Sequence, residues 1–269
     1  MRTFLLAVAA ASALSSIPDG PGAVRAQSAA GPPDFSGVYY PIAAAAPGRG
    51  RAGAPPPAAQ NAPGRPGALP PPTRSAPTSD GRNGRAPDAP KLTAEYLAKW
   101  EVMRRSRMSG SSEFDPAARC IPAGMPAMMA MTYGMEIMQT GDKITMYGEL
   151  NDMYRRIYLD GRRASQKVLD DPTYAGYSTG RWEGSTLVVD TVALRDDSLI
   201  DGFSPHSDKM TVRERLTMVE PGVLEDRITV TDPVALLEPH QSVRRFRRAS
   251  SPNDELREFA CAEGLADAK

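Results

Sequence analysis

Residues 209–219, KMTVRERLTMV, place an apolar side chain on almost every second position. This period of two is typical of a β-strand with one buried face, because successive side chains of a strand point to opposite sides. Similar short segments recur along the chain and predict a series of strands. The other predicted strands are DFSGVYY (34–40), MEIMQT (135–140), KITMYGE (143–149), MYRRIYL (153–159), YSTGRWE (177–183), STLVVDTVA (185–193), VLEDRITVT (223–231), SVRRFRR (242–248) and LREFAC (256–261).

Several joints between these segments are short and contain glycine, at 140–142 (TGD), 160–161 (DG), 183–184 (EG) and 221–222 (PG). Such joints are typical of hairpins, because glycine adopts the positive φ that tight turns require. Hairpins make neighbouring strands antiparallel, and a long series of them must curl or stack to cover its edges. The sequence therefore predicts an all-β fold, an antiparallel up-and-down barrel or a strongly curved sheet, with a two-sheet sandwich as the alternative.

One long helix is predicted, at TAEYLAKWEVMRR (93–105), where apolar and aromatic residues recur near helical spacing. Thr93 precedes it and is a residue type that caps helices. We expect this helix to plug one end of the barrel. A single further helical turn is predicted at DPAARC (115–120), where an Asp precedes a Pro.

Residues 41–90 are mostly Pro, Ala and Gly with scattered arginines. Such a segment cannot bury enough apolar surface to offset the entropy of ordering it, so a disordered insert is predicted. The insert separates an N-terminal segment with the first strand, residues 27–40, from a β domain at 91–264, and residues 265–269 form a tail.

The N-terminus has the composition of a secretory signal. MRTFLLAVAAASAL combines Arg2 with a short apolar run, and the small-residue exit VRA follows, which predicts cleavage after Ala26. The apolar run is too short to span a bilayer, and no other stretch is long and apolar enough to do so. We therefore expect a periplasmic or secreted protein with a signal peptide at 1–26 and no transmembrane segment.

The two cysteines, Cys120 and Cys261, are expected to form a disulfide bond, the default in an oxidising compartment. Closing a loop of about 140 residues would restrict the unfolded chain by about 5 kcal/mol in the loop-entropy model. The bond would join the first ordered turn of the domain to its last predicted strand.

Formal net charge is zero, from 32 basic and 32 acidic residues. This balance gives no electrostatic case for a nucleic-acid partner, which requires a clearly basic face. The local basic run VRRFRR (243–248) is interpreted as a solvated strand edge, because a strand would divide its arginines between both faces.

Several motifs together resemble an uncharacterised family of exported bacterial β-rich proteins. The resemblance covers most of the chain outside the insert and implies export and a β-rich fold, but no particular activity. The motifs that carry it are RRIYLDGR (155–162), GRWEGSTLVVDT (180–191), PHSD (205–208) and VRER (212–215).

Two departures from the family pattern limit what carries over. The family's LDGR continues into Pro-His, whereas Arg163-Ala164 follows here, so no role of that histidine applies. The early strand reads Gly37-Val38-Tyr39 where the family has Gly-Val-Trp. This Gly-x-aromatic start also resembles the opening strand of a lipocalin barrel, at the level of architecture only.

Glu214 is the first candidate for chemistry, because it falls on the apolar side of its predicted strand. Burial would raise the pKa of its carboxyl, and a neighbouring cation would lower that pKa again. Arg155 shares one side of strand 153–159 with apolar residues. The other side, which carries Arg156 and Tyr158, also contains apolar groups, so either arginine could face inward. A Glu–Arg pair can anchor a ligand carboxylate, hold a base in position or serve structure alone, and these alternatives stay open.

His206 is the second candidate, in the loop SPHSD at the entrance of a strand. Imidazole titrates near neutrality, which suits a general base, although loop His–Asp pairs also form turns. A metal site is not predicted, because the second histidine, His240, lies in a separate segment and no zinc-ligand spacing is present. Trp182, expected to pack beside a hairpin, completes the candidate ligand-binding residues with Arg155, Arg156 and Tyr158.

The methionine-rich segment MPAMMAMTYGMEIM (125–138) has two interpretations. Clustered thioethers bind copper(I), but methionine also fills irregular cores, and core filling is the favoured interpretation. No cofactor is predicted, since the sequence contains no phosphate-binding glycine loop, no Gly-x-Ser-x-Gly elbow and no haem-attachment motif.

These features predict an exported β-barrel-like protein that binds a small, largely apolar molecule. One alternative is an enzyme that uses the same cavity for acid/base chemistry, as an isomerase, lyase or hydrolase with Glu214 or His206 as the catalytic residue. The other is a structural or interaction domain of the cell envelope. Because the ligand-binding hypothesis puts Glu214 in the site, it requires that Glu214 face a hollow inside the barrel.

Overall fold

The computed structural model describes residues 31–42, 85–251, 253–259 and 261. The predicted signal peptide at 1–26 and tail at 265–269 lie outside the described residues, as do residues 43–84 of the predicted insert.

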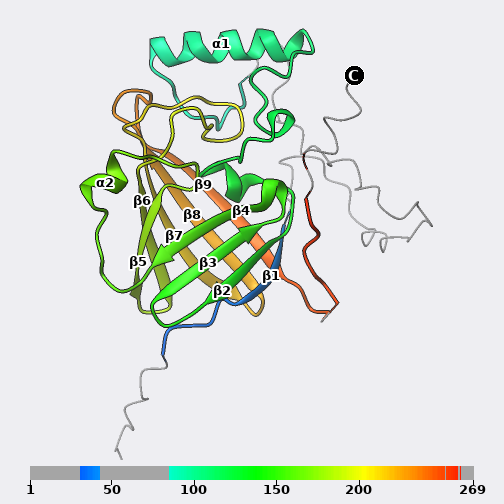
Figure 1. The fold of residues 1–269 in the computed structure, drawn as a ribbon, viewed down its shortest axis with the longest axis vertical. Coiled ribbons are helices and arrows are strands. Elements are labelled where there is room, and N and C mark those ends of the chain that lie inside the picture. Colours follow the sequence, from blue (N-terminus) through cyan, green and yellow to red (C-terminus); the bar gives the residue numbers. More distant parts are fainter. Residues whose placement is uncertain (1–30, 43–84, 252, 260, 262–269) are drawn as a thin grey trace, which may run out of the picture. The chain divides into compact units, whose positions relative to one another are not determined.

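The described strands close into one barrel in chain order, from β1 to β9 (Figure 1). Antiparallel pairing of β9 with β1 completes the ring, and closure removes the unpaired edges that an open sheet would expose. The predicted all-β barrel is therefore confirmed. The strands are β1 (Gly37–Pro41), β2 (Met135–Gln139), β3 (Lys143–Gly148), β4 (Met153–Tyr158), β5 (Tyr177–Glu183), β6 (Thr186–Val192), β7 (Thr211–Glu220), β8 (Val223–Thr231) and β9 (His240–Arg248).

Three of the predicted hairpin joints are confirmed, at 140–142, 183–184 and 221–222, where the flanking strands pair antiparallel. The prediction of a hairpin at 160–161 is wrong. Strands β4 and β5 run parallel, so the chain must cross over between them, and it does so through the short helix α2 (Gln166–Leu169). The Asp160 carboxylate instead accepts a hydrogen bond from the Arg162 backbone N–H.

Two further strand predictions need correction. The described residues of LREFAC (256–261) form no strand, and the Leu256 side chain instead lies against Gly134, ahead of β2. VRRFRR (243–248) is a strand but not an edge, because β9 pairs with both β8 and β1. Its arginines therefore alternate between the interior and the outer surface of a closed barrel.

The predicted helix forms as α1 (Ala94–Met108) and buries Tyr96, Trp100 and Met103. Thr93 precedes it, but its hydroxyl donates to the Val234 carbonyl at 3.1 Å and does not cap the helix. Arg107, near the helix end, donates to the carbonyls of Gly202 and Phe203. The helix thus packs on the loops at one barrel end (Figure 1).

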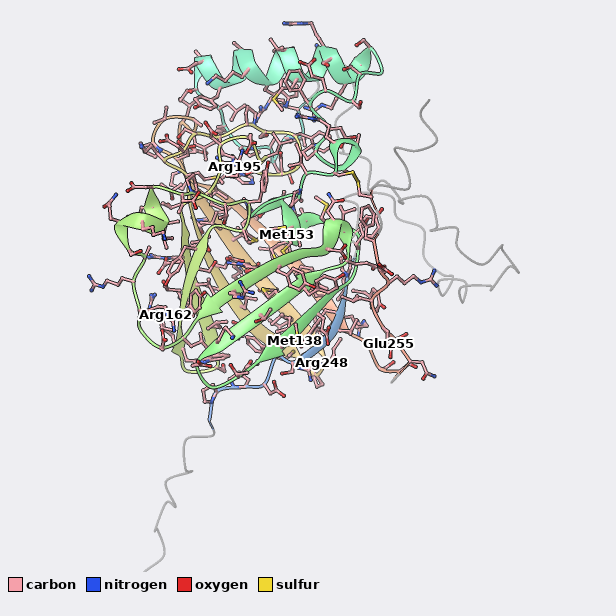
Figure 2. The ribbon with its side chains drawn as sticks, in the orientation of Figure 1. Met138, Met153, Arg162, Arg195, Arg248 and Glu255 are labelled. Carbon is pink, nitrogen blue, oxygen red and sulfur yellow. A yellow bond between two sulfur atoms is a disulfide. The ribbon has the colours of Figure 1, made fainter. Side chains whose placement is uncertain are left out.

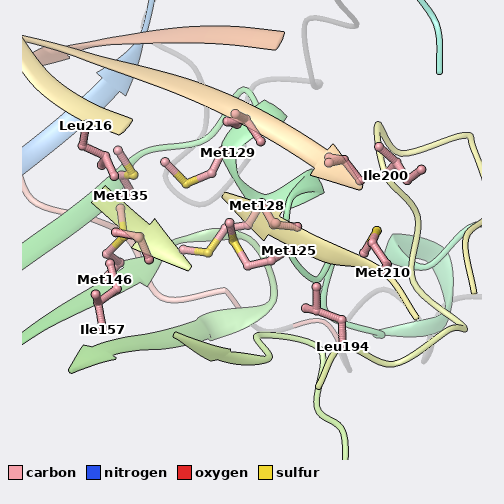
Figure 3. Close-up of a cluster of buried hydrophobic side chains, with 14 of the residues drawn as sticks. Met125, Met128, Met129, Met135, Met146, Ile157, Leu194, Ile200, Met210 and Leu216 are labelled. Atoms are coloured by element: carbon pink, nitrogen blue, oxygen red, sulfur yellow. The ribbon is translucent and has the colours of Figure 1, made fainter. Parts of the chain in front are cut away.

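The methionine-rich turn η2 (Ala127–Ala130) contributes to the same hydrophobic core as Tyr96 and Trp100 of α1. Met128 and Met129 are buried in the central hydrophobic cluster, close to Met135, Met146 and Leu216 (Figure 3). The Met128 methyl lies 3.0 Å from where a Cβ on residue 148 would stand, so Gly148 leaves room for it. The core-filling interpretation of this segment is confirmed.

Two short turns complete the described helices, η1 (Ala117–Arg119) and η3 (Leu150–Asp152). The predicted turn at 115–120 contains η1, and the Asp115 carboxylate accepts a hydrogen bond from the Ala117 N–H at 3.0 Å. Cys120, directly after η1, is disulfide-bonded to Cys261, as predicted (Figure 2). Within the described ranges, no helix combines the length and apolar character that crossing a bilayer requires.

Candidate functional site

Glu214 and Arg155 meet inside the barrel. Alternation along β7 points Val212, Glu214 and Leu216 inward, and Glu214 is 0% exposed. Arg155 points inward from β4 and is 1% exposed. The predicted interior acid and its arginine neighbour are therefore confirmed as a buried pair.

The Arg155 guanidinium is fully occupied by its surroundings. Its Nη1 donates to Glu214 Oε1 at 2.8 Å, and its Nη2 donates to Glu214 Oε2 in a two-pronged contact. Its Nε donates to Ser178 Oγ at 3.1 Å, and Nη2 also donates to Thr191 Oγ1 at 3.0 Å. In this geometry the buried charges of Arg155 and Glu214 satisfy each other within the barrel.

Asp226 is the third member of this interior cluster, and the sequence reasoning missed it. It is 0% exposed on β8, and neither carboxyl oxygen has a hydrogen-bond partner among the described residues if the group is ionised. Burial raises the pKa of the Asp226 carboxyl well above its usual value, and the negative charge of Glu214 raises it further. A neutral carboxyl can donate its proton to Glu214, so burial and the Glu214 charge both favour the protonated form of Asp226. The alternation in VLEDRITVT, which sets Asp226 on the side of Leu224 and Ile228, was the available signal.

Neither of two cavities in the described structure adjoins the Glu214 carboxylate. The two best-formed cavities of the described residues have volumes of about 10 and about 20 Å³, and neither is lined by Glu214 or Arg155. A single water molecule needs about 10–15 Å³ on this measure, so both cavities are of water size. The ligand chamber that the sequence analysis expected beside Glu214 is thus neither of these cavities, and Glu214 itself is fully buried.

The other predicted ligand-binding residues do not converge. Arg156 and Tyr158 alternate with the inward residues of β4 and lie on its outer face, where Tyr158 stacks on Tyr177 at 5.2 Å between ring centroids. Trp182 packs edge-to-face on Phe35 at 5.2 Å and contributes to the core. Arg156, Tyr158 and Trp182 line neither cavity.

His206 is held by structural contacts on both ring nitrogens. Its Nδ1 donates to the Ser207 carbonyl at 2.8 Å, and Nε2 lies 2.8 Å from Ser198 Oγ, whose hydroxyl also lies 2.9 Å from the Arg195 carbonyl. Burial lowers the pKa of His206 and so favours its neutral form. Ser207 is tied in turn to Asp232, whose carboxylate accepts from the Ser207 N–H at 2.7 Å and from its hydroxyl at 2.8 Å. These contacts anchor the loop that contains His206 and Ser207.

The smaller cavity, called the mouth cavity below, lies where β8 ends and β9 begins. Its walls combine inward-facing residues of both strands with parts of η2 and of the loop after β6. Sequence reasoning assigned its polar residues to a solvated edge or to a separate loop. The lining residues are Pro126, Ala130, Ile200, Asp201, Ile228, Val230, His240, Ser242 and Arg244.

The second cavity is lined by η2 and by residues of β2, β3 and β4, with four thioethers, from Met128, Met131, Met135 and Met153. Most of its lining residues, Tyr133 among them, are apolar or aromatic. Across the described ranges, no group of three or more His, Cys, Asp or Glu side chains is arranged to hold a metal ion.

No protein-family model and no curated protein matches the chain. Similar solved structures include the wild-type fluorescent protein UnaG, which is 20% identical over 51% of this chain and 88% of that chain, with a TM-score of 0.28. A single-site mutant of UnaG gives 19% identity over 51% and 88%, with a TM-score of 0.29. The likeness is confined to fold.

Proposed function

We propose that the protein binds a small, largely apolar molecule at one end of its barrel, outside the cytoplasm. The mouth cavity supports this proposal, because its walls combine five apolar residues with polar groups from Asp201 and from His240, Ser242 and Arg244 of β9. Small-molecule sites usually have this composition and lie at the open ends of barrels. The site proposed here replaces the chamber beside Glu214.

Binding must enlarge the mouth cavity, which has a volume of about 10 Å³. Pro126 and Ala130 form its η2 wall, and the same turn inserts Met128 and Met129 into the core. Methionine side chains are flexible and repack at low cost, so η2 is the wall that can yield. We expect the apolar part of a ligand to take the place of η2 side chains.

Titration with the neutral apolar fluorophore N-phenyl-1-naphthylamine tests the proposal. Saturable enhancement of its fluorescence is expected, and Ala130→Phe, which fills the mouth cavity, should weaken binding by at least about tenfold, or about 1.4 kcal/mol. The matched control is Ala98→Phe on the exposed side of α1, which should leave binding unchanged. Absence of saturable binding, or equal binding by both variants, would contradict the proposal.

A structural or interaction role is the second candidate, and the packed interior favours it specifically. Both cavities are of water size, and the core around the Arg155–Glu214 pair is filled by side chains. Native mass spectrometry of protein purified from its own host separates the two candidates. A co-purified small molecule supports the binding role, whereas bare protein that also fails to take up the fluorophore supports the structural one.

Acid/base catalysis by Glu214 or His206 gains no support from the geometry. Glu214 is bidentate to Arg155 without an adjoining cavity, and both ring nitrogens of His206 have partners. A catalytic base must reach a substrate proton, and neither group can do so in this arrangement.

Export is supported by the disulfide between Cys120 and Cys261, because such bonds persist in oxidising compartments. The test is the N-terminus of protein isolated from the periplasm or culture medium. Mass spectrometry should find a chain that begins after Ala26 and has no free thiol. An intact N-terminus on cytoplasmic protein with reduced cysteines would refute export.

A further inference from the structure

The inner face of β9 carries three polar side chains in succession. His240, Ser242 and Arg244 lie on alternate positions, directly opposite Val230, Ile228 and Asp226 of β8, and all three line the mouth cavity. Strand alternation sends the intervening residues, such as Arg245, to the outer surface. One strand thus delivers a guanidinium, an imidazole and a hydroxyl to a single small space.

Arg244 has no ion-pair partner among the described residues. It lies opposite Asp226 in the register, and its charge lowers the pKa of Asp226, which burial and the charge of Glu214 raise by more. The Nε of Arg244 is enclosed and has no acceptor within the described part of the chain. The neighbouring Arg245, in contrast, donates to Glu225 at 2.7 Å. Arg244 therefore lines the mouth cavity with an unsatisfied donor.

A second guanidinium, that of Arg85, adds to the positive charge near the same place. Its Nη1 is buried without a partner among the described residues, while Nη2 donates to the Pro90 carbonyl and the group lies over the Trp100 ring at 5.1 Å. Burial lowers the pKa of Arg85, and the charges of Asp201 and Glu101 offset this only in part. Both Arg85 and Arg244 lie close enough to His240 to disfavour its protonation.

Two acidic groups also lie at this end. Asp201 lines the mouth cavity, and its carboxylate accepts from the N–H groups of Phe203 and Ser204 and from the Ser204 hydroxyl. The charges of Asp201 and Asp88 raise the pKa of His240, against the effect of burial. Arg107 contributes a further partly buried guanidinium, which donates to the carbonyls of Gly202 and Phe203 and lies over the Phe203 ring at 4.9 Å. In the described part of the chain, the buried side-chain donors without an acceptor are Arg85 Nη1 and Arg244 Nε.

We infer that the mouth cavity binds the carboxylate of an amphipathic monocarboxylic acid, with Arg244 as the main anchor and His240 and Ser242 as further donors. This inference rests on the proposed function and names the ligand class. A planar guanidinium fork matches a carboxylate, and a charge-assisted hydrogen bond satisfies the enclosed Nε. The apolar tail then lies against Ile200, Ile228 and the η2 wall.

A comparison of dodecanoate with dodecanol at neutral pH tests the inference, because the two probes differ only in the head group. Displacement of N-phenyl-1-naphthylamine from the folded full-length protein gives both affinities. Dodecanoate should bind wild-type protein at least about tenfold more tightly than dodecanol. Arg244→Gln should weaken dodecanoate about thirtyfold and change dodecanol less than about twofold. Arg245→Gln, on the outer face, is the matched control and should change neither.

Each outcome distinguishes the inference from the function on which it rests. Equal affinities of the acid and the alcohol for wild-type protein overturn the carboxylate anchor and leave a binding barrel in place. Failure of the fluorophore and both probes to bind overturns the proposed function and the inference together. If Arg244→Gln does not fold, Arg244→Lys retains the charge without the fork, and the wild-type comparison decides the question by itself.

Discussion

The protonation state of Asp226 leads to a prediction with an unusual sign. Most buried carboxylates stabilise a fold when ionised, but Asp226 is enclosed beside Glu214 and keeps its proton. Asp226→Asn replaces a neutral carboxyl by a neutral amide of nearly the same shape. We therefore expect the variant to fold and to gain stability over wild type as the pH rises.

The magnitude follows from proton linkage. Above the ordinary carboxyl pKa of 3.8, the unfolded chain releases the Asp226 proton while the folded chain retains it. The stabilising effect of a raised folded-state pKa is complete below pH 3.8 and is lost as the pH rises toward the folded-state value. Wild type therefore loses about 1.4 kcal/mol per pH unit in this window, and the asparagine variant does not. The free energy of unfolding of Asp226→Asn, relative to that of wild type, should rise by about 1.4 kcal/mol between pH 4.5 and 5.5.

Urea denaturation followed by tryptophan fluorescence at several pH values measures this difference. The matched control is Glu225→Gln, one residue away on the outer face. Burial opposes ionisation of Glu225, but Arg245 and Arg227 outweigh it and lower the pKa of that carboxyl. Ionised Glu225 stabilises the fold above pH 4.5, and this effect is lost as the pH falls. Glu225→Gln should therefore show no gain in stability over wild type as the pH rises. A pH-independent difference for Asp226→Asn, or one that falls as pH rises, would refute a protonated Asp226.

Other predictions concern the contacts that hold the fold. Glu214→Gln should lower the free energy of unfolding, measured by urea denaturation, by about 3–5 kcal/mol, because it leaves the Arg155 charge buried and unpaired. A decrease of less than about 1 kcal/mol would show that Glu214 is not the main partner of Arg155. Replacement of Cys120 and Cys261 by serine should lower the free energy of unfolding by at most about 5 kcal/mol, the loop-entropy value for a separation of 141 residues, and an unchanged value would contradict that role. Asp232→Ala should cost about 1–3 kcal/mol and speed amide hydrogen exchange across 204–208, since Ser207 loses both of its acceptors, and unaltered exchange there would mean that the anchor is unimportant.

Local pattern was sufficient to place nearly all of the strands. Period-two alternation located β7 and β8 to within two residues, and glycine-containing joints located three hairpins. The same local signal failed at Asp160-Gly161, because an Asp-Gly turn can end a strand as well as reverse it. It failed also at 256–261, where apolar residues pack on a neighbour without pairing.

The interior acid and base were visible in the sequence, but the state of the interior was not. Alternation placed Glu214 inside and allowed either Arg155 or Arg156 beside it, and only the pairing of β4 with β3 and the closure of the barrel selected Arg155. Whether the space beside that pair is open depends on side chains from other strands, such as Met146 of β3, whose sulfur lies 3.9 Å from Arg155 Nη1.

The sequence by itself therefore determined the strands, the helix, the disulfide and the presence of a buried acid, since each depends on residue type and spacing. Tertiary structure alone decided that the inner side of β9 lines a cavity, that burial raises the pKa of Asp226 and that the Arg244 Nε is enclosed without an acceptor among the described residues. The physical reason is that charge state and free volume depend on every neighbour at once, and those neighbours come from segments far apart along the chain.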